Sequence, residues 1–117
     1  MKSDRVYLQH ILEMIERIQA VSAVGQIAFK ASTLHQDAVL RNLHTMTETT
    51  QRLSSELKTN HSEIDWATLA RFRNVLVHDY LGIDIDLVWT VITNDVPQLA
   101  TKVREILAVL DDEGRRD

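Results

Sequence analysis

Apolar side chains recur at steps of three and four residues along almost the whole chain, which is the period of an amphipathic α-helix. Residues that form turns are scarce, because the 117 residues include only 3 Gly and 1 Pro. An all-β fold needs many short strands joined by turns that are rich in these two residues. The chain is therefore predicted to be all-α, and its length predicts a single domain over residues 1–117.

The first half of the chain is predicted to form two long helices. The first is expected from about residue 4 to residue 22, with Gly25 marking its end. Residues 26–35 are less periodic and leave room for one short helix. The second long helix is expected from near Thr33 to near Asn60, on a continuous apolar series with alternating spacings of four and three residues.

The second half of the chain is predicted to add a shorter and a longer helix. Asp65, which follows the apolar Ile64, is expected to cap a third helix that stops before Gly82. A fourth helix follows and continues to about residue 111, with the charged residues beyond it expected to fray. These segments predict an antiparallel bundle of about four to five helices, a fold class that does not by itself define a function.

Two features of the fourth helix concern its start and its shape. Asp84 and Asp86 lie at its start and form an Asp-x-Asp pair, for which helix capping is favoured over metal binding. Pro97 lies inside the helix and is expected to kink it near Thr93 or Asn94, because proline lacks the N–H that an α-helix uses.

Composition excludes several kinds of chemistry. The chain has no Cys, which removes thiol nucleophiles, disulfides and thiolate metal sites together. Its five histidines lack the spacing of a zinc site, so neither a metal nor a cofactor is expected. No signal peptide and no membrane span of about 18 apolar residues is apparent, which favours a soluble, cytoplasmic protein. The net charge of -4 argues against a broad nucleic-acid-binding surface but leaves room for one local basic site.

Arg73 is the most unusual residue of the predicted third helix, because it lies in the middle of the apolar face. On a helical wheel, six residues lie within about 60° of it: Trp66, Leu69, Ala70, Leu76, Val77 and Tyr80. A guanidinium keeps its charge, so it must pair with a carboxylate, lie at a second interface or bind an anionic ligand. His78 projects about 140° away from Arg73, with Asn74 near the stripe of His78.

The two side chains diverge within one regular helix, but two copies of the helix across a twofold axis could bring both pairs to one cleft. Arginine binds phosphate through two hydrogen bonds and stabilises a pentacoordinate transition state, while histidine exchanges protons near neutral pH. RNA supplies its own nucleophile, the 2'-hydroxyl, which DNA lacks. Arginine and histidine together are therefore close to the minimum set for metal-independent RNA cleavage by a homodimer.

Residues 66–80, WATLARFRNVLVHDY, resemble the signature of the HEPN superfamily of small helical ribonucleases. The matching positions are Arg73, the polar Asn74, His78 after three more residues, and Tyr80 after one more. The flanking runs QDAVLRNLHTMTET and LGIDIDLVWTVITNDVPQLA resemble HepT-type toxins of toxin–antitoxin pairs whose antitoxin is a minimal nucleotidyltransferase. The resemblance extends over about residues 35–110.

The resemblance implies a HEPN-like homodimeric endoribonuclease toxin that cleaves RNA in a cleft lined by two copies of the motif. Arg73 and His78 would be catalytic, and Asn74 would support or orient them. The antitoxin, a nucleotidyltransferase, would silence the toxin by transferring AMP to Tyr80, because the added phosphate repels the RNA backbone.

The chain departs from the family pattern at one place in the second predicted long helix. Relatives often have Gly followed by Glu there, whereas this chain has Thr47 and Glu48. Glu48 is predicted to pair with the arginine of the motif as a supporting residue. Backbone packing at Thr47 is expected to differ from that of the relatives.

Simpler interpretations of the same residues remain open. Arg73 can be a structural arginine tied to an acid such as Glu48, His78 a surface histidine near a helix end, and Tyr80 an amphipathic residue at the edge of the core. In the alternative function, the chain is a non-catalytic HEPN-like binding module that holds a nucleotide or a nucleotidyltransferase partner. The acidic net charge favours this alternative mildly.

Overall fold

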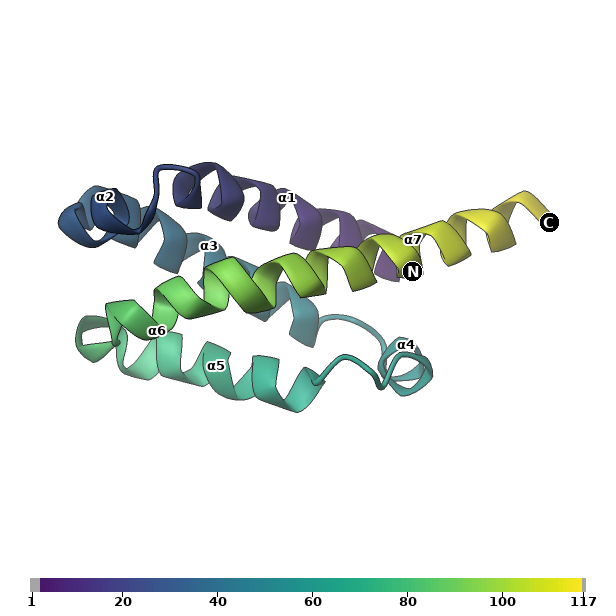
Figure 1. Ribbon diagram of the computed structural model, residues 1–117. Helices are drawn as coiled ribbons and strands as arrows, with labels where there is room; N and C mark the ends of the chain where they lie inside the picture. Colours follow the sequence, from purple (N-terminus) through teal and green to yellow (C-terminus); the bar gives the residue numbers. More distant parts are fainter. Residues whose placement is uncertain (1–2, 117) are drawn as a thin grey trace.

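The computed structural model describes residues 3–116, and this range contains α-helices and no strand (Figure 1). The α-helices are α1 (Asp4–Ser22), α2 (Gln26–Ala31), α3 (Thr33–Gln51), α4 (Ser55–Asn60), α5 (Trp66–His78), α6 (Ile85–Thr90) and α7 (Val96–Arg116). A 3-10 turn, η1 (Tyr80–Gly82), follows α5, and a π-helical segment, η2 (Val91–Asp95), joins α6 to α7. The all-α bundle predicted from the apolar period is therefore confirmed.

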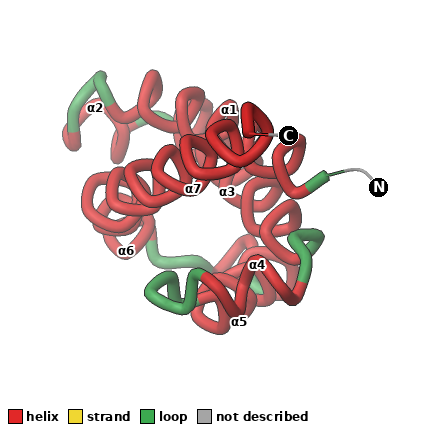
Figure 2. Tube along the Cα trace, turned by 90° about the vertical axis from the view of Figure 1, so that its right-hand side faces the viewer, coloured by secondary structure: helices red, strands yellow, loops and turns green. Residues whose placement is uncertain are grey.

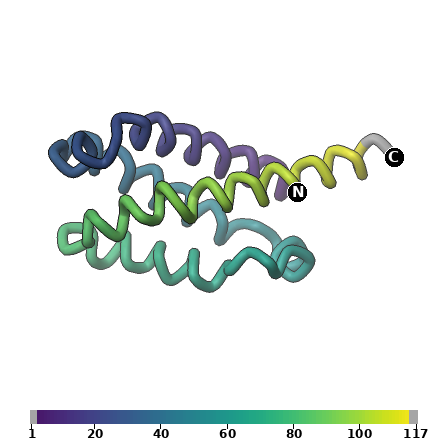
Figure 3. Tube along the Cα trace, in the orientation of Figure 1, coloured from purple at the N-terminus to yellow at the C-terminus, as the bar shows by residue number. Residues whose placement is uncertain are grey.

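The long helices lie side by side and form a bundle. α3 packs against α1 on one side and against α5 on the other, and α1 also packs against α7. Viewed along the bundle, α5 lies on the opposite side from α1, with α3 and α7 between them (Figure 2). The short helix α2 lies at one end of the bundle, together with the turn between α5 and α6, and α4 lies at the other end (Figure 3). No helix in the described range is both long enough and apolar enough to span a membrane.

The core contains apolar side chains from α1, α3 and α7. The fully or almost fully buried ones on these helices are Leu8, Ile11, Ile15, Ile18, Val39, Leu40, Leu43, Met46, Val96, Leu99, Ala100, Val103 and Ile106. Helix α5 contributes one buried side chain, Leu76, while Leu69 and Phe72 are only partly buried against the core. α5 is thus the least covered of the long helices in the described part of the chain.

The third helix begins where it was predicted to begin. The carboxylate of Asp65 accepts hydrogen bonds from the backbone N–H of Thr68 at 3.0 Å and from its hydroxyl at 2.7 Å. This cap satisfies one of the N–H groups that a helix leaves unpaired in its first turn. The helix ends at His78, before η1 and Gly82, as the sequence predicted.

The prediction of the second long helix was wrong beyond residue 51. Helix α3 ends at Gln51, and a separate helix, α4, starts after Ser54. The Ser54 hydroxyl accepts a hydrogen bond from the N–H of Leu57 at 3.1 Å, and the same serine donates to the carboxylate of Asp4 from its N–H at 2.8 Å and from its hydroxyl at 2.6 Å. Serine competes with the helix for backbone partners, so these contacts divert the chain although the apolar period continues.

The fourth predicted helix has the expected start and distortion but not the expected end. Asp84 caps α6 by accepting a hydrogen bond from the N–H of Asp86 at 2.9 Å. The π-helical segment Val91–Asp95 ends two residues before Pro97, whose ring and missing N–H disturb the hydrogen bonds of the preceding helical turn. The prediction of an end near residue 111 was wrong, because α7 continues to Arg116 and Asp111 forms an ion pair with Arg5 of α1.

The contacts of Ser54 predict a measurable contribution to stability. We expect Ser54→Ala to lower the free energy of unfolding by about 1–2 kcal/mol, because it removes the α4 cap and the hydroxyl bond to Asp4. Urea denaturation measures this value. Ser55→Ala is the matched control, because Ser55 is the exposed first residue of α4. An equal loss in both variants would contradict the role of the cap.

Candidate active site

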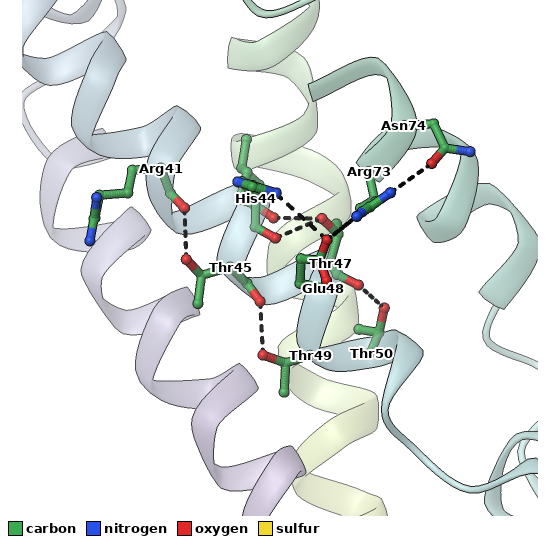
Figure 4. A network of polar contacts seen from close by, with 10 residues as sticks. Arg41, His44, Thr45, Thr47, Glu48, Thr49, Thr50, Arg73 and Asn74 are labelled. Carbon is green, nitrogen blue, oxygen red and sulfur yellow. Dashed lines mark hydrogen bonds and ion pairs between the residues drawn. The ribbon is translucent and has the colours of Figure 1, made fainter. Parts of the chain in front are cut away.

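The residues of the HEPN-like motif lie on the least covered helix and on the turn that follows it. Arg73, Asn74 and His78 belong to α5, and Tyr80 is the first residue of η1. The opposite wall of the candidate site is the partly exposed side of α3 that carries His44 and Glu48, and α3 packs along α5 (Figure 4). The site is therefore built at the surface between two helices that the core holds together.

Arg73 pairs with Glu48 of α3. Its Nε donates to Glu48 Oε1 at 2.5 Å, and its Nη2 forms an ion pair with the same oxygen (Figure 4). The side chain of Arg73 is 27% exposed and that of Glu48 is 32% exposed, so the pair is shielded on one side and open on the other. Of the three options left open for this guanidinium, the structure shows the pairing with a carboxylate of its own chain, and the pairing predicted for Glu48 is confirmed.

Two further side chains complete the polar network around this pair. Arg73 Nη1 donates to Asn74 Oδ1 at 3.2 Å, so the neighbouring amide helps to orient the guanidinium. His44 lies one turn before Glu48 on α3, and its Nε2 is 3.7 Å from Glu48 Oε1 (Figure 4). One carboxylate oxygen is thus shared by an arginine in direct contact and a histidine at slightly greater distance.

The carboxylate of Glu48 is held in its charged form. The hydrogen bond from Arg73 is the main cause that lowers the pKa of Glu48, and the charges of Arg73, His44 and Arg52 act in the same direction. Removal from water opposes this shift but does not reverse it. At neutral pH the pair therefore consists of a full positive and a full negative charge.

Thr47, where the family pattern often has glycine, fits into the bundle without an unpaired hydroxyl. The residue is fully buried, and its Oγ1 donates to the backbone carbonyl of Leu43 at 2.9 Å and lies 3.1 Å from that of His44. A threonine that bonds to its own helix in this way adds bulk but no unsatisfied polar group. The helix continues regularly to Glu48, so the departure at Thr47 does not prevent the pairing with Arg73.

His78 does not join the Arg73 network. It is the exposed last residue of α5, and no hydrogen bond or ion pair of its side chain occurs within the described residues. Arg73 points toward α3, and the helical wheel places His78 on another side of α5. As expected from the wheel, one chain does not bring the two side chains together.

Tyr80 contacts the start of α3. Its hydroxyl donates to Asp37 Oδ1 at 3.4 Å, and its side chain is 39% exposed. Partial burial is the main cause that raises the pKa of Tyr80, and the charge and the hydrogen bond of Asp37 add to it. The hydroxyl therefore stays protonated at neutral pH, on a residue that is partly exposed.

Sequence reasoning did not single out Asp37 and His44 as parts of this site. Both are separated from Glu48 by whole helical turns, at spacings of 11 and 4 residues, which place all three side chains on one face of α3. This spacing was the available signal. Its meaning depends on α5 lying along that face, which the helical pattern does not reveal.

A model of the HepT-like ribonuclease family matches residues 11–106. A candidate RNase of Caldanaerobacter subterraneus subsp. tengcongensis is 32% identical over 92% of this chain and 96% of its own length. The probable ribonuclease HepT of Thermococcus cleftensis is 32% identical over 90% of this chain and 96% of its own length.

A longer relative shares the same region. It is a protein of Methanocaldococcus jannaschii named as a gamma-glutamylcyclotransferase and candidate RNase, and it is 33% identical over 94% of this chain. The chain spans 50% of the length of that relative. No solved structure matches the chain significantly.

The helical bundle, the motif on α5 and these matches define a ribonuclease of the HEPN type. The chain belongs to the HepT-like ribonuclease family. This membership confirms the resemblance drawn from residues 66–80 and the enzyme class that the resemblance implied.

The lowered pKa of Glu48 predicts how pH changes stability. A carboxyl group with a lowered pKa stabilises the folded state above its unfolded pKa, and this contribution is lost as pH falls through the folded pKa. We expect Glu48→Gln to be less stable than the wild type at pH 7, with a smaller difference at about pH 3. Urea denaturation at both pH values measures the two differences.

Glu13→Gln is the matched control for this prediction, because Glu13 is an exposed glutamate on α1. The control should follow the wild type at both pH values. A difference between Glu48→Gln and the wild type that is equal at both pH values would contradict the assigned cause.

Proposed function

We propose that the protein is the toxin of a cytoplasmic toxin–antitoxin system, a homodimeric endoribonuclease that cleaves RNA without a metal ion. The observation that carries this proposal is the position of Arg73. In a member of a ribonuclease family, the motif arginine is held by Glu48 and Asn74 at the surface between α3 and α5, with one side open to solvent. An oriented, partly exposed guanidinium is suited to bind a phosphate through two hydrogen bonds.

The divergence of Arg73 and His78 supports a site made by two chains. A second copy of α5 across a twofold axis places the partner's motif beside this one, so that the arginine of one chain and the histidine of the other meet. The exposed surface of this region contains apolar side chains: Val75 and Val77 are each 40% exposed and Leu81 is 98% exposed. Covering these side chains favours association of two chains through this region.

The proposed reaction uses the 2'-hydroxyl of RNA as the nucleophile. His78 accepts the proton of this hydroxyl as its oxygen forms a bond to the adjacent phosphorus. The bond from phosphorus to the 5'-oxygen breaks, and the leaving oxygen takes a proton from a histidine in its protonated form. Arg73 contacts the nonbridging oxygens and stabilises the extra negative charge of the transition state. The products are a 2',3'-cyclic phosphate and a 5'-hydroxyl end.

The proposed regulation acts through Tyr80. A nucleotidyltransferase antitoxin transfers AMP from ATP to Tyr80, a partly exposed residue at the start of η1. The phenolic oxygen gives up its proton and bonds to the α-phosphorus of ATP, and the bond from this phosphorus to pyrophosphate breaks. The new phosphodiester adds bulk and negative charge two residues after His78. RNA is repelled by this charge, so modification lowers cleavage without unfolding the chain.

A non-catalytic binding module is the second candidate function. Two observations favour it: the net charge is -4, and the positive charge of Arg73 is already offset by Glu48. Such a module holds a nucleotide or a nucleotidyltransferase partner and leaves RNA intact. The cleavage experiment below separates it from the toxin.

The catalytic assignment predicts the loss of RNA cleavage in two variants. We expect Arg73→Ala and His78→Ala each to lower the cleavage rate by about 100-fold or more in buffer with EDTA, while helical content stays unchanged. Cleavage is measured on purified, unmodified protein by gel electrophoresis of RNA, and helical content by circular dichroism. Arg104→Ala is the control, an exposed arginine on α7. Intact RNA with the wild type would indicate the binding module instead.

The modification hypothesis predicts a change in mass on one residue. After co-expression with the cognate nucleotidyltransferase, mass spectrometry should find AMP on Tyr80, and Tyr80→Phe should remain unmodified because it lacks the accepting hydroxyl. Tyr7→Phe is the matched control and should be modified like the wild type, because Tyr7 lies on α1. An unchanged mass of the wild type would reject the modification.

A further inference from the structure

His44 of α3 occupies a position for which the motif gives no role. Its side chain is 45% exposed, and its Nε2 is 3.7 Å from the Glu48 oxygen that Arg73 contacts (Figure 4). The histidine therefore borders the candidate site from the side of α3, whereas the residues of the motif border it from α5.

The charge of the Arg73 and Glu48 pair poses a problem for RNA binding. The two side chains together carry no net charge, because the pKa of Glu48 is lowered and the guanidinium is always protonated. A phosphodiester carries one negative charge, and a pair without net charge attracts it weakly. If Arg73 turns toward the phosphate, Glu48 also loses its partner, and an unpaired carboxylate at a partly shielded position is costly.

We propose that His44, in its protonated form, is an additional RNA-binding residue. It forms the ion pair with Glu48 when Arg73 leaves this carboxylate to bind a phosphate. This inference rests on the proposed RNA cleavage. A protonated imidazole gives the cluster of Arg73, Glu48 and His44 a single positive charge, whereas a neutral imidazole leaves the cluster without net charge. The protonated imidazole also gives Glu48 a second cation, and the guanidinium becomes available to the RNA.

The charged groups around His44 are compatible with this role. On its own helix, Glu48 is the carboxylate within ion-pair distance, and Arg52 acts on Glu48 from the following turn. From α5, Arg73 faces the same oxygen. Asp37, two turns earlier on α3, is engaged by the hydroxyl of Tyr80 of η1. Protonated His44 is thus held by one carboxylate that it shares with the arginine of the motif.

The test measures RNA binding in the absence of cleavage. The probe is a fluorescent oligoribonucleotide with 2'-O-methyl groups throughout, which lacks the nucleophile, and its Kd is measured by anisotropy at pH 8 and pH 5.5 at one ionic strength. All measurements are made in a His78→Gln background, because the exposed histidine of the proposed cleft would add its own charge at the lower pH. In this background we expect binding to be about fivefold tighter at the lower pH, the effect of one added charge contact. His44→Gln should lose most of this change. His10→Gln, the control on the exposed face of α1, should keep it.

A permanently charged variant separates this role from a structural one. In the same His78→Gln background, His44→Lys should bind at pH 8 as tightly as the protein with His44 binds at pH 5.5, because the charge of lysine does not depend on pH in this range. RNA cleavage by the wild type together with an unchanged pH dependence of binding in His44→Gln would overturn the role of His44 alone. Absence of both RNA binding and cleavage in the wild type would overturn the proposed function and the role of His44 with it.

Discussion

The ion pair between Arg73 and Glu48 is the interaction on which the site depends. It joins α5, the least covered long helix, to α3, which buried apolar side chains hold against α1. A guanidinium on the apolar side of a helix needs a partner, because it cannot lose its charge. Glu48 meets this need from a neighbouring helix, and Asn74 and His44 are arranged around the contact.

The same pair stabilises the chain and limits its chemistry. A carboxylate that orients an arginine also cancels its charge, so binding of a phosphate has to compete with an existing contact. The partial exposure of both side chains leaves room for this exchange. The structural interpretation of Arg73 and the catalytic one are therefore compatible. A residue between two helices can stabilise the fold in the free protein and bind the substrate in the complex.

The site shows which residues can be predicted from a motif and which cannot. Arg73, Asn74, His78 and Tyr80 were identified because they follow one another at fixed short spacings on one helix and its turn. The pairing of Glu48 was expected from the family pattern, but Asp37 and His44 were not found. Their place in the site depends on contacts of α3 with α5 and with η1. Arg73 of α5 and Glu48 are 25 positions apart in the sequence, and Tyr80 of η1 and Asp37 are 43 positions apart.

The sequence by itself determined the all-α fold, the start of α5 at its Asp65 cap and the distortion before Pro97, because apolar period, capping and proline geometry are local properties. Tertiary structure alone decided where α3 ends, because the contact of Ser54 with Asp4 joins residues 50 positions apart and overrides a continuous apolar period. It also decided that Asp37 and His44 border the site, because they meet Tyr80 and the Glu48 carboxylate only when α3 lies along α5. These outcomes depend on how two helices are placed against each other, which the core packing of the whole chain determines.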